Sequence, residues 1–320
     1  EIGEKNNFKR MIIRFAGGEP LLEFENLKKF ISYSQEKLPL YSFSLRFEVL
    51  TNGSLITEEI AQFFKENNIA ILVSLDGLDF YHNQQKIKRE GEKTFHLAER
   101  GIRLLKKYNV AFNTNTVITK LNLPGLPEFV NWLISEKITF MFSFVRKNLF
   151  GDWSLVPSNQ ELTSTLFKIY KNLRETKLDY SYYPRITSQI ANRVPLFYQS
   201  KKICSLGYGV LVIDQKGDVF PCQMLISQQK YKLGNLLEQK TNRPEILNHR
   251  EIDNLNLEIE NRPVCQKCQW KYICRGGNCP IDSFLHYGSL TAPSFYCPTF
   301  KAIIPEALKL EAERLIRYKR

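Results

Sequence analysis

Residues 11–20 read Met-Ile-Ile-Arg-Phe-Ala-Gly-Gly-Glu-Pro, and they set a pattern that the first half of the chain repeats. The apolar run 11–15 is short and is followed by a glycine turn, which is typical of a buried strand. We therefore expect a strand that runs directly into a Gly-Gly-Glu-Pro turn, followed by a helix over residues 23–38.

The same alternation of strand and helix continues to about residue 145. Polar or glycine-containing turns follow the predicted strands, and in parallel α/β folds the chemistry gathers at the carboxyl ends of the strands. This pattern predicts a parallel α/β sheet or barrel with five strand–helix alternations. The further strands are expected at residues 43–50, 69–74, 110–118 and 138–145, with helices at 57–67, 94–108 and 125–136.

Composition limits the class of protein without choosing a partner. The chain has 320 residues, 43% of them hydrophobic, and a formal net charge of +12, which attracts anions in general, whether nucleic acid, phosphates or an acidic peptide. No apolar run reaches the length of a membrane helix and no segment resembles a signal peptide, so we expect a cytoplasmic protein without a membrane partner.

After residue 150 the regular alternation stops. We expect a helix at 159–175, and a hairpin in which Val210 to Asp214 and Asp218 to Phe220 flank a Gln-Lys-Gly turn. A basic helix is expected at 301–319. The predicted domains are a barrel over 1–150, a bridge with a remaining barrel helix over 151–203, a cysteine-rich domain over 204–300 and a C-terminal helix over 301–320.

All seven cysteines follow residue 203, and an odd number cannot be fully paired in intramolecular disulfides. A C-x2-C step lets two thiolates reach one metal group, and Gly276 and Gly277 let the backbone approach it. Spacing alone leaves three interpretations open: one zinc site with three spare thiols, purely structural thiols, or two iron–sulfur clusters. The candidate metal ligands are Cys204, Cys222, Cys265, Cys268, Cys274, Cys279 and Cys297.

This pattern resembles the seven-cysteine SPASM domain, which is found at the C-terminus of radical S-adenosylmethionine (SAM) peptide and protein maturases. The gap between Cys274 and Cys279 is one residue longer than usual, and Asn278 looks like an insertion. The residues that carry the resemblance are Cys204, Gly217-Asp-Val-Phe-Pro-Cys222, Cys265-Gln-Lys-Cys268, Cys274-Arg-Gly-Gly-Asn-Cys279 and Cys297.

The resemblance implies two auxiliary [4Fe–4S] clusters. One would be held by four thiolates. The other would be held by three, which leaves one iron open or bound by a non-cysteine group. The four-cysteine set would be Cys265, Cys268, Cys274 and Cys297, and the three-cysteine set would be Cys204, Cys222 and Cys279.

Gly17-Gly18-Glu19-Pro20 resembles the radical SAM G-G-E-P motif, which receives the amino group of the methionine part of the cofactor. Two successive glycines leave the backbone uncovered by side chains, so its carbonyl oxygens can accept hydrogen bonds from an ammonium group. Together with the cysteine pattern, this resemblance implies a partial (β/α)6 TIM-like barrel from which the first strand is missing.

Asn52 and Ser74 also follow predicted strands, as does Asp76, and they resemble further cofactor positions of this family, near the ribose and carboxylate. Ordinary turn chemistry explains Asn-Gly and Asp-Gly equally well. Relatives carry an Arg about twelve residues after the Ser, where this chain has Lys86. Lysine keeps the positive charge but cannot bind a carboxylate through two parallel N–H donors as arginine does. The alternative interpretation is that Lys86 belongs to a solvated basic face.

The family's C-x3-C-x2-C triplet, which holds the catalytic [4Fe–4S] cluster, should precede the G-G-E-P motif. No cysteine occurs before Cys204. We therefore expect a chain truncated at its N-terminus, which as it stands does not cleave SAM. The complete enzyme would use SAM to remove a hydrogen from its substrate.

Relatives that oxidise a sulfatase residue carry an Asp directly after the second cluster cysteine, and this chain has Gln223. That difference disfavours sulfatase maturation and favours thioether formation, carbon–carbon crosslinking or epimerisation of a ribosomally made peptide or protein. Expected partners are a precursor with an acidic leader, and an electron donor such as a flavodoxin or ferredoxin. The alternative is a non-catalytic binding protein stabilised by zinc or clusters, although no helix-turn-helix pattern supports nucleic acid.

Overall fold

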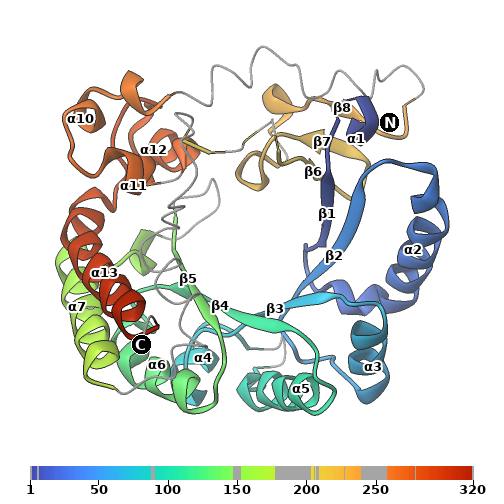
Figure 1. The fold of residues 1–320 in the computed structure, drawn as a ribbon, viewed down its shortest axis with the longest axis horizontal. Coiled ribbons are helices and arrows are strands. Elements are labelled where there is room, and N and C mark those ends of the chain that lie inside the picture. The colour runs from blue at the N-terminus through green and yellow to red at the C-terminus, as the bar shows by residue number, and fades with distance from the viewer. Residues whose placement is uncertain are drawn as a thin grey trace.

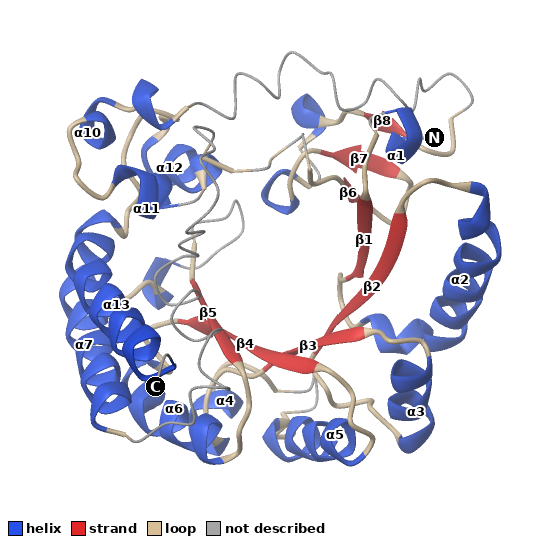
Figure 2. Cartoon of the chain, in the orientation of Figure 1, coloured by secondary structure: helices blue, strands red, loops and turns tan. Residues whose placement is uncertain are grey.

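The computed structural model describes residues 2–5, 7–87, 91–146, 153–176, 203–204, 206, 209–226, 228–238, 258–277 and 279–318. Its first half contains a sheet of five parallel strands whose spatial order is the same as their order in the chain. This arrangement is the predicted partial barrel, and Figure 2 shows the strands as one continuous arc. The strands are β1 (Arg10–Phe15), β2 (Ser44–Thr51), β3 (Ala70–Ser74), β4 (Phe112–Ile118) and β5 (Phe140–Phe144).

Helices connect successive strands and cover the convex side of the arc (Figure 1). Their apolar faces join one large core with the outward residues of the strands, such as Val49 and Val73, which are fully buried. The observed bounds lie within about two residues of the predicted ones, because both periods, two for a strand and 3.6 for a helix, are regular here. The helices are α2 (Phe24–Lys37), α3 (Glu58–Glu66), α5 (Phe95–Lys107) and α6 (Leu126–Ser135).

Two short helices were not predicted, α1 (Ile2–Lys5) and α4 (Asp79–Asn83). The second follows Asp76-Gly77, where the sequence predicts only a turn, and it places His82 and Asn83 in the interior. A helix of five residues is too short to show a periodic pattern, so the sequence could not reveal it.

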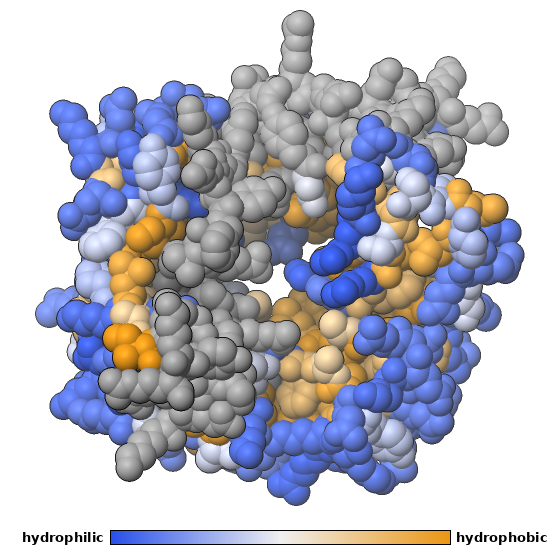
Figure 3. All heavy atoms as spheres, in the orientation of Figure 1, coloured by the Kyte–Doolittle hydropathy of each residue, from blue (hydrophilic) through white to orange (hydrophobic). Residues whose placement is uncertain are grey.

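The concave side of the arc carries pairs of polar side chains. Arg14 on β1 pairs with Glu48, its register neighbour on β2, through an Nε–Oε2 hydrogen bond of 2.8 Å. At the other end of the arc, the hydroxyl of Ser143 on β5 donates to the side-chain oxygen of Asn115 on β4 at 2.9 Å. In Figure 3 the molecule is hollowed at this central position. The inner face of the half-barrel therefore combines polar pairs with exposed apolar side chains such as Ile12.

Glycines allow one close contact that shapes the carboxyl edge of the sheet. Gly101 on α5 packs against the turn after β2 so closely that a Cβ at residue 101 would lie 2.2 Å from the carbonyl oxygen of Gly53. Gly53 itself has a φ of +79°, a conformation that favours glycine. The turn that contains Asn52 is thus held in place by a helix packed directly against its backbone.

The second half of the chain is rich in loops. The predicted hairpin is present: β6 (Val212–Ile213) and β7 (Asp218–Phe220) are antiparallel, and β8 (Gly234–Asn235) adds a third strand. β6 is shorter than the predicted Val210 to Asp214, whereas β7 has the predicted bounds. Three further helices surround the cysteines, and these are α10 (Pro263–Gln266), α11 (Lys271–Cys274) and α12 (Pro280–Tyr287).

Helix α7 (Asn159–Glu175) has the predicted bounds, and a capping box between Ser158 and Glu161 fixes its start. It packs against α13 (Cys297–Tyr318) (Figure 1). The expected start of this last helix at residue 301 is wrong by four residues, because Pro298 occupies the first turn, where no backbone donor is needed.

The buried residues of α13 belong to the same core as the barrel helices, so the last helix does not stand apart from the first half of the chain. Most of the predicted bridge, from 177 to 202, lies outside the described residues. Within the described part of the chain, no helix is long and apolar enough to cross a bilayer.

Candidate functional site

The predicted cofactor residues gather at one edge of the sheet. Gly17 to Pro20 follow β1, Asn52 follows β2, and Ser74 and Asp76 lie at and just beyond the end of β3. These three strands are parallel neighbours, so their carboxyl ends lie side by side.

Glu19 ties the first two loops together. Its Oε1 accepts hydrogen bonds from the Thr51 hydroxyl at 2.7 Å and the Leu21 amide at 3.1 Å, and its Oε2 accepts one from the Asn52 amide at 2.8 Å. Both carboxylate oxygens are therefore engaged by protein donors. Glu19 positions the loops, and its neighbours Gly17 and Gly18 carry the exposed backbone.

The two glycines leave open space beside the chain. A Cβ built on Gly17 or on Gly18 would meet no other atom within 4 Å, and Gly17 has a φ of +135°. Pro20 then begins a short 3-10 turn, Pro20–Glu23. The backbone at this point is accessible to a ligand, as the G-G-E-P resemblance implies.

Lys86 joins the two predicted residues of the third loop. Its Nζ donates a hydrogen bond to the Ser74 hydroxyl and lies 2.9 Å from Oδ2 of Asp76, whose carboxylate is almost completely buried. The other oxygen of Asp76 accepts from the Val117 amide at 2.8 Å, which links β3 to β4. Asp76 is thus a buried connector, and Lys86 is its counter-charge. Lys88 and Arg89 lie outside the described residues.

His82 holds this loop through the backbone of Asp76, and no sequence pattern indicates this role. Its Nδ1 accepts from the Asp76 amide at 3.2 Å, and its Nε2 lies 3.2 Å from the Thr94 hydroxyl. Because that hydroxyl donates to the Lys86 carbonyl, the network requires a neutral imidazole protonated at Nε2. Burial, and then the charge of Lys86, lower the pKa of His82 to about 4.

No disulfide joins any of the seven cysteines, all of which the structure describes. They fall into the two predicted sets. The first set lines one cavity together with Gly276, Gly277 and the side chain of Trp270. We call this set the four-thiol set, and its members are Cys265, Cys268, Cys274 and Cys297.

The remaining thiols, Cys204, Cys222 and Cys279, share a separate small apolar core with Leu206 and Leu225, and we call them the three-thiol set. Each of these sulfurs accepts a backbone amide hydrogen bond. The donor to Cys204 is Leu206 at 3.1 Å. Met224 donates to Cys222 at 3.4 Å and Asp282 donates to Cys279 at 3.3 Å. Such bonds stabilise sulfur that carries negative charge.

The thiols are held in surroundings that disfavour free thiolates. Burial raises the pKa of Cys222 to about 11 and that of Cys274 to about 12. Thiols of this kind ionise when a metal takes the place of the proton. Among the described residues, no three Cys, His, Asp or Glu side chains are arranged to hold a single metal ion.

Two arginines near the thiols were missed by the sequence analysis. Arg146 follows β5, and its charge acts against burial to lower the pKa of Cys204 and Cys222. A charge at the carboxyl edge of the sheet thus acts on two thiols of the three-thiol set. Arg262 is completely buried just before Cys265. Only packing reveals either residue, because nothing in the local sequence distinguishes them from surface arginines.

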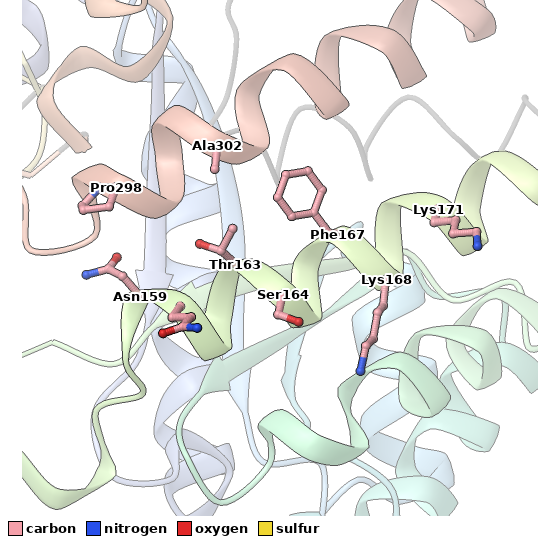
Figure 4. A pocket seen from close by; sticks show the side chains of 9 residues that line it. Asn159, Thr163, Ser164, Phe167, Lys168, Lys171, Pro298 and Ala302 are labelled. Carbon is pink, nitrogen blue, oxygen red and sulfur yellow. The ribbon is translucent and has the colours of Figure 1, made fainter.

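A further groove lies between α7 and α13, and no predicted site residue lines it (Figure 4). Polar side chains of α7 such as Asn159 and Thr163 form one wall, and Pro298 and Ala302 form part of the other. It is separate from the cofactor edge described above.

Comparison with known families agrees with these two regions. The family model for the radical SAM superfamily matches residues 2–133. The model for SPASM, an iron–sulfur cluster-binding domain, matches residues 204–269. The second match covers the first part of the predicted domain 204–300 and leaves its end untested.

Curated relatives are similar over most of the chain. A cysteine-type anaerobic sulfatase-maturating enzyme of Clostridium novyi is 25% identical over 299 residues, which is 90% of this chain and 78% of the relative. An AdoMet-dependent heme synthase of Methanosarcina barkeri is 26% identical over 315 residues, 92% of this chain and 84% of the relative.

Two solved structures share the fold. Native anSMEcpe with bound AdoMet aligns with a TM-score of 0.82 at 22% identity, over 98% of this chain and 87% of the other. The structure of native anSMEcpe with bound AdoMet and Kp18Cys peptide aligns with a TM-score of 0.78 at 22% identity, over 98% and 88%. At this identity the likeness establishes the fold alone.

Proposed function

Because the chain is a radical SAM enzyme with a SPASM domain, related to the anaerobic sulfatase-maturating enzymes, we propose that it modifies a ribosomally made peptide or protein by removing a hydrogen atom. The products that fit are a thioether crosslink, a carbon–carbon crosslink or an epimerised residue. A peptide bound to a solved structure of the same fold supports this substrate class.

The observation that carries the proposal is the sorting of seven thiols into a cavity-lining set of four and a separate set of three. The charge of Arg146, which follows β5 at the carboxyl edge of the half-barrel, acts on Cys204 and Cys222 of the three-thiol set. We infer that a group held by these three cysteines would act close to the substrate.

SAM bound at the carboxyl edge supplies the radical that abstracts hydrogen. The open backbone at Gly17 and Gly18 would accept the ammonium group of the cofactor, while Glu19 fixes the spacing to Asn52. Lys86 offers a positive charge to the cofactor carboxylate. Ser74 and Asp76 would hold that lysine in position, with Pro20, Asn52 and the glycines completing the site.

Gln223 distinguishes this chain from enzymes that need a carboxylate base at the same place. It directly follows Cys222, is exposed, and its amide cannot accept a proton at neutral pH. Oxidation of a sulfatase residue is therefore the second enzyme candidate, favoured by the named relatives and disfavoured by this side chain. The net charge of +12 suits an acidic leader peptide, and a flavodoxin or ferredoxin would supply electrons.

No cysteine precedes Cys204 in the 320 residues, so no C-x3-C-x2-C triplet is present to hold a catalytic cluster. We expect the 320-residue chain by itself to bind auxiliary clusters without cleaving SAM. Tests of catalysis should use protein that carries a catalytic cluster, as iron and sulfide analysis verifies.

The test is an anaerobic reaction of that protein with SAM, dithionite and a cysteine-containing precursor peptide, followed by mass spectrometry. A product that has lost two hydrogen atoms indicates a crosslink, and uptake of one deuterium from heavy water indicates epimerisation. A formylglycine product would support sulfatase-type maturation instead, and full conversion to it would overturn the role given to Gln223.

Metal analysis separates the enzyme from the alternative of a zinc-stabilised binding protein. Two clusters predict about seven to eight irons with matching sulfide, whereas a zinc site predicts zinc without sulfide. With three cysteines, one iron of the second cluster has an open or exchangeable ligand. Mössbauer spectroscopy with and without a cysteine-containing peptide tests whether that iron binds the substrate thiolate or serves only in electron transfer.

A further inference from the structure

Arg262 is a buried cation between the two thiol sets. It is the N-cap residue of α10, three positions before Cys265, and its exposed fraction is 0%. A guanidinium keeps its proton at every physiological pH, so burial cannot be relieved by neutralisation. A charge in such a position requires partners that compensate for the lost water.

The partners within the protein are incomplete. Nη1 donates to the carbonyl oxygen of Gly276 at 3.1 Å. Nε and Nη2 are both buried and donate to no oxygen or nitrogen atom in the described part of the chain, and the sulfur of Cys265 is a hydrogen-bond partner of the guanidinium. A neutral thiol compensates poorly for the water that a buried guanidinium loses.

Two thiols and one carboxylate act on the Arg262 guanidinium. Burial lowers the pKa of Arg262 most, and Cys265, then Cys279 and Asp282, act to raise it. Cys265 belongs to the four-thiol set and Cys279 to the three-thiol set. In addition, Cys265 packs in one small apolar cluster with Ile259 and Cys204, so the two sets adjoin where Arg262 is buried.

The space for the guanidinium is built by a glycine. A Cβ on Gly276 would lie 2.7 Å from Nη1 of Arg262, and Gly276 has a φ of +63°. The chain therefore combines a conformation suited to glycine with a cavity for one cation, next to the Cys274–Cys279 segment. This arrangement aims a fixed charge at the positions where the clusters would be held.

We propose that Arg262 is a positioning residue for the auxiliary clusters: its Nε and Nη2 donate hydrogen bonds to cluster or cysteine sulfur, and its charge raises the reduction potential of the cluster held by the four-thiol set. This inference rests on the proposed binding of iron–sulfur clusters. One-electron reduction converts [4Fe–4S]2+ to [4Fe–4S]+ and adds one negative charge. A nearby fixed cation and N–H···S bonds stabilise that added charge.

The test is a redox titration of the anaerobic holoprotein with dithionite, followed by electron paramagnetic resonance. The first variant is Arg262→Met, which removes the positive charge and the N–H donors. The second is Arg262→Lys, which keeps the positive charge but lacks the planar set of N–H donors. Arg103→Met is the matched control, because Arg103 is an exposed arginine on α5 that pairs with Glu99. Iron and sulfide are measured for every protein before titration.

In Arg262→Met, we expect one auxiliary cluster to become harder to reduce. At the wild-type midpoint its oxidised-to-reduced ratio should rise at least tenfold, equivalent to about 59 mV for a one-electron couple. Arg262→Lys should shift less, and Arg103→Met should match the wild type. Unchanged potentials in a fully loaded Arg262→Met protein would overturn the inference and leave the proposed function intact.

If Arg262→Met fails to retain iron, the Arg262→Lys variant shows whether the positive charge or only the shape of the side chain is needed. Retention of both clusters by Arg262→Lys supports a need for the positive charge, whereas equal loss in both variants assigns Arg262 to shape alone and refutes the proposal. Wild-type protein without iron and sulfide would instead refute the proposed function and this inference together.

Discussion

The carboxylate of Glu19 accepts a hydrogen bond from the backbone amide of Asn52 at 2.8 Å, so that the turn after β1 is fastened to the turn after β2. The same carboxylate also accepts from the Thr51 hydroxyl and the Leu21 amide. One side chain thus fixes the relative positions of two loops that are 33 residues apart in the chain.

Replacing Glu19 with Gln should loosen this junction, because an amide nitrogen would face a backbone donor. We expect a loss of about 1–3 kcal/mol in the free energy of unfolding, measured by urea denaturation. Glu23→Gln is the control, since the exposed Glu23 just before α2 accepts a hydrogen bond only from the side chain of Asn26 among the described contacts. Equal stability of the two variants would show that the junction contributes little.

Gly18→Leu should separate cofactor binding from folding. No atom lies within 4 Å of the position of a Cβ at Gly18, so the side chain fits the folded protein and projects into the space proposed for SAM. We expect an unchanged melting temperature and loss of SAM binding by calorimetry, both measured on protein loaded with its clusters. Normal binding by this variant would contradict the proposed site.

Gly101→Ala should destabilise the fold although alanine is the better helix former. The new Cβ would lie 2.2 Å from the Gly53 carbonyl oxygen, and backbone on both sides cannot easily move. Overpacking destabilises the folded state by about 1–3 kcal/mol, whereas the higher helix propensity of alanine stabilises it by roughly 1 kcal/mol, so we expect a net loss. Thermal unfolding checks the net loss, with Gly18→Ala as a glycine-to-alanine control that meets no neighbour.

His82 predicts a specific dependence of stability on pH. Its pKa is lowered from 6.5 to about 4 in the fold, so the unfolded chain takes up a proton first as the pH falls. The stabilisation is complete above pH 6.5 and is lost as the pH falls toward 4, by about 3 kcal/mol in total. Between pH 7 and 4.5, the free energy of unfolding of His82→Gln should depend less on pH than that of the wild type. His96→Gln, at an exposed position on α5, should show the pH dependence of the wild type.

Single cysteine substitutions should remove the clusters one at a time. Cys268→Ala affects the four-thiol set and Cys222→Ala the three-thiol set, and each variant should lose about half of the auxiliary iron. The remaining paramagnetic resonance signals should differ between the two. Identical spectra, or complete loss of iron in both, would argue against two independently ligated groups.

Much of the half-barrel could be predicted from the sequence because its strands and helices keep regular periods. The same holds for the sorting of the thiols, which follows from spacing and resemblance. The contact between Lys86 and Ser74 also agrees with their separation of twelve residues. Asp76 as the buried partner of that lysine was not foreseen, because its burial depends on Val117 in the next strand.

The features that escaped prediction depend on contacts between distant residues. Arg262 looks like a surface residue in the sequence Asn261-Arg262-Pro263, and only the cavity beside Gly276 makes it an interior cation. The start of α13 was placed too late, since Pro298 can end one segment or begin a helix with equal ease. Local pattern gives no way to choose between these alternatives.

The position of α13 also has a consequence for the order of biosynthesis. Ile303, Ile304 and Leu310 are buried in the core that residues 21–173 otherwise form, and Cys297 in the first turn of the same helix lines the four-thiol cavity. The ribosome makes this segment after all five strands of the sheet. The half-barrel therefore cannot complete its core, and the four thiols are not all available to a cluster, until translation has passed residue 310. Such non-local closure slows folding and leaves the nascent N-terminal sheet dependent on chaperones in the meantime.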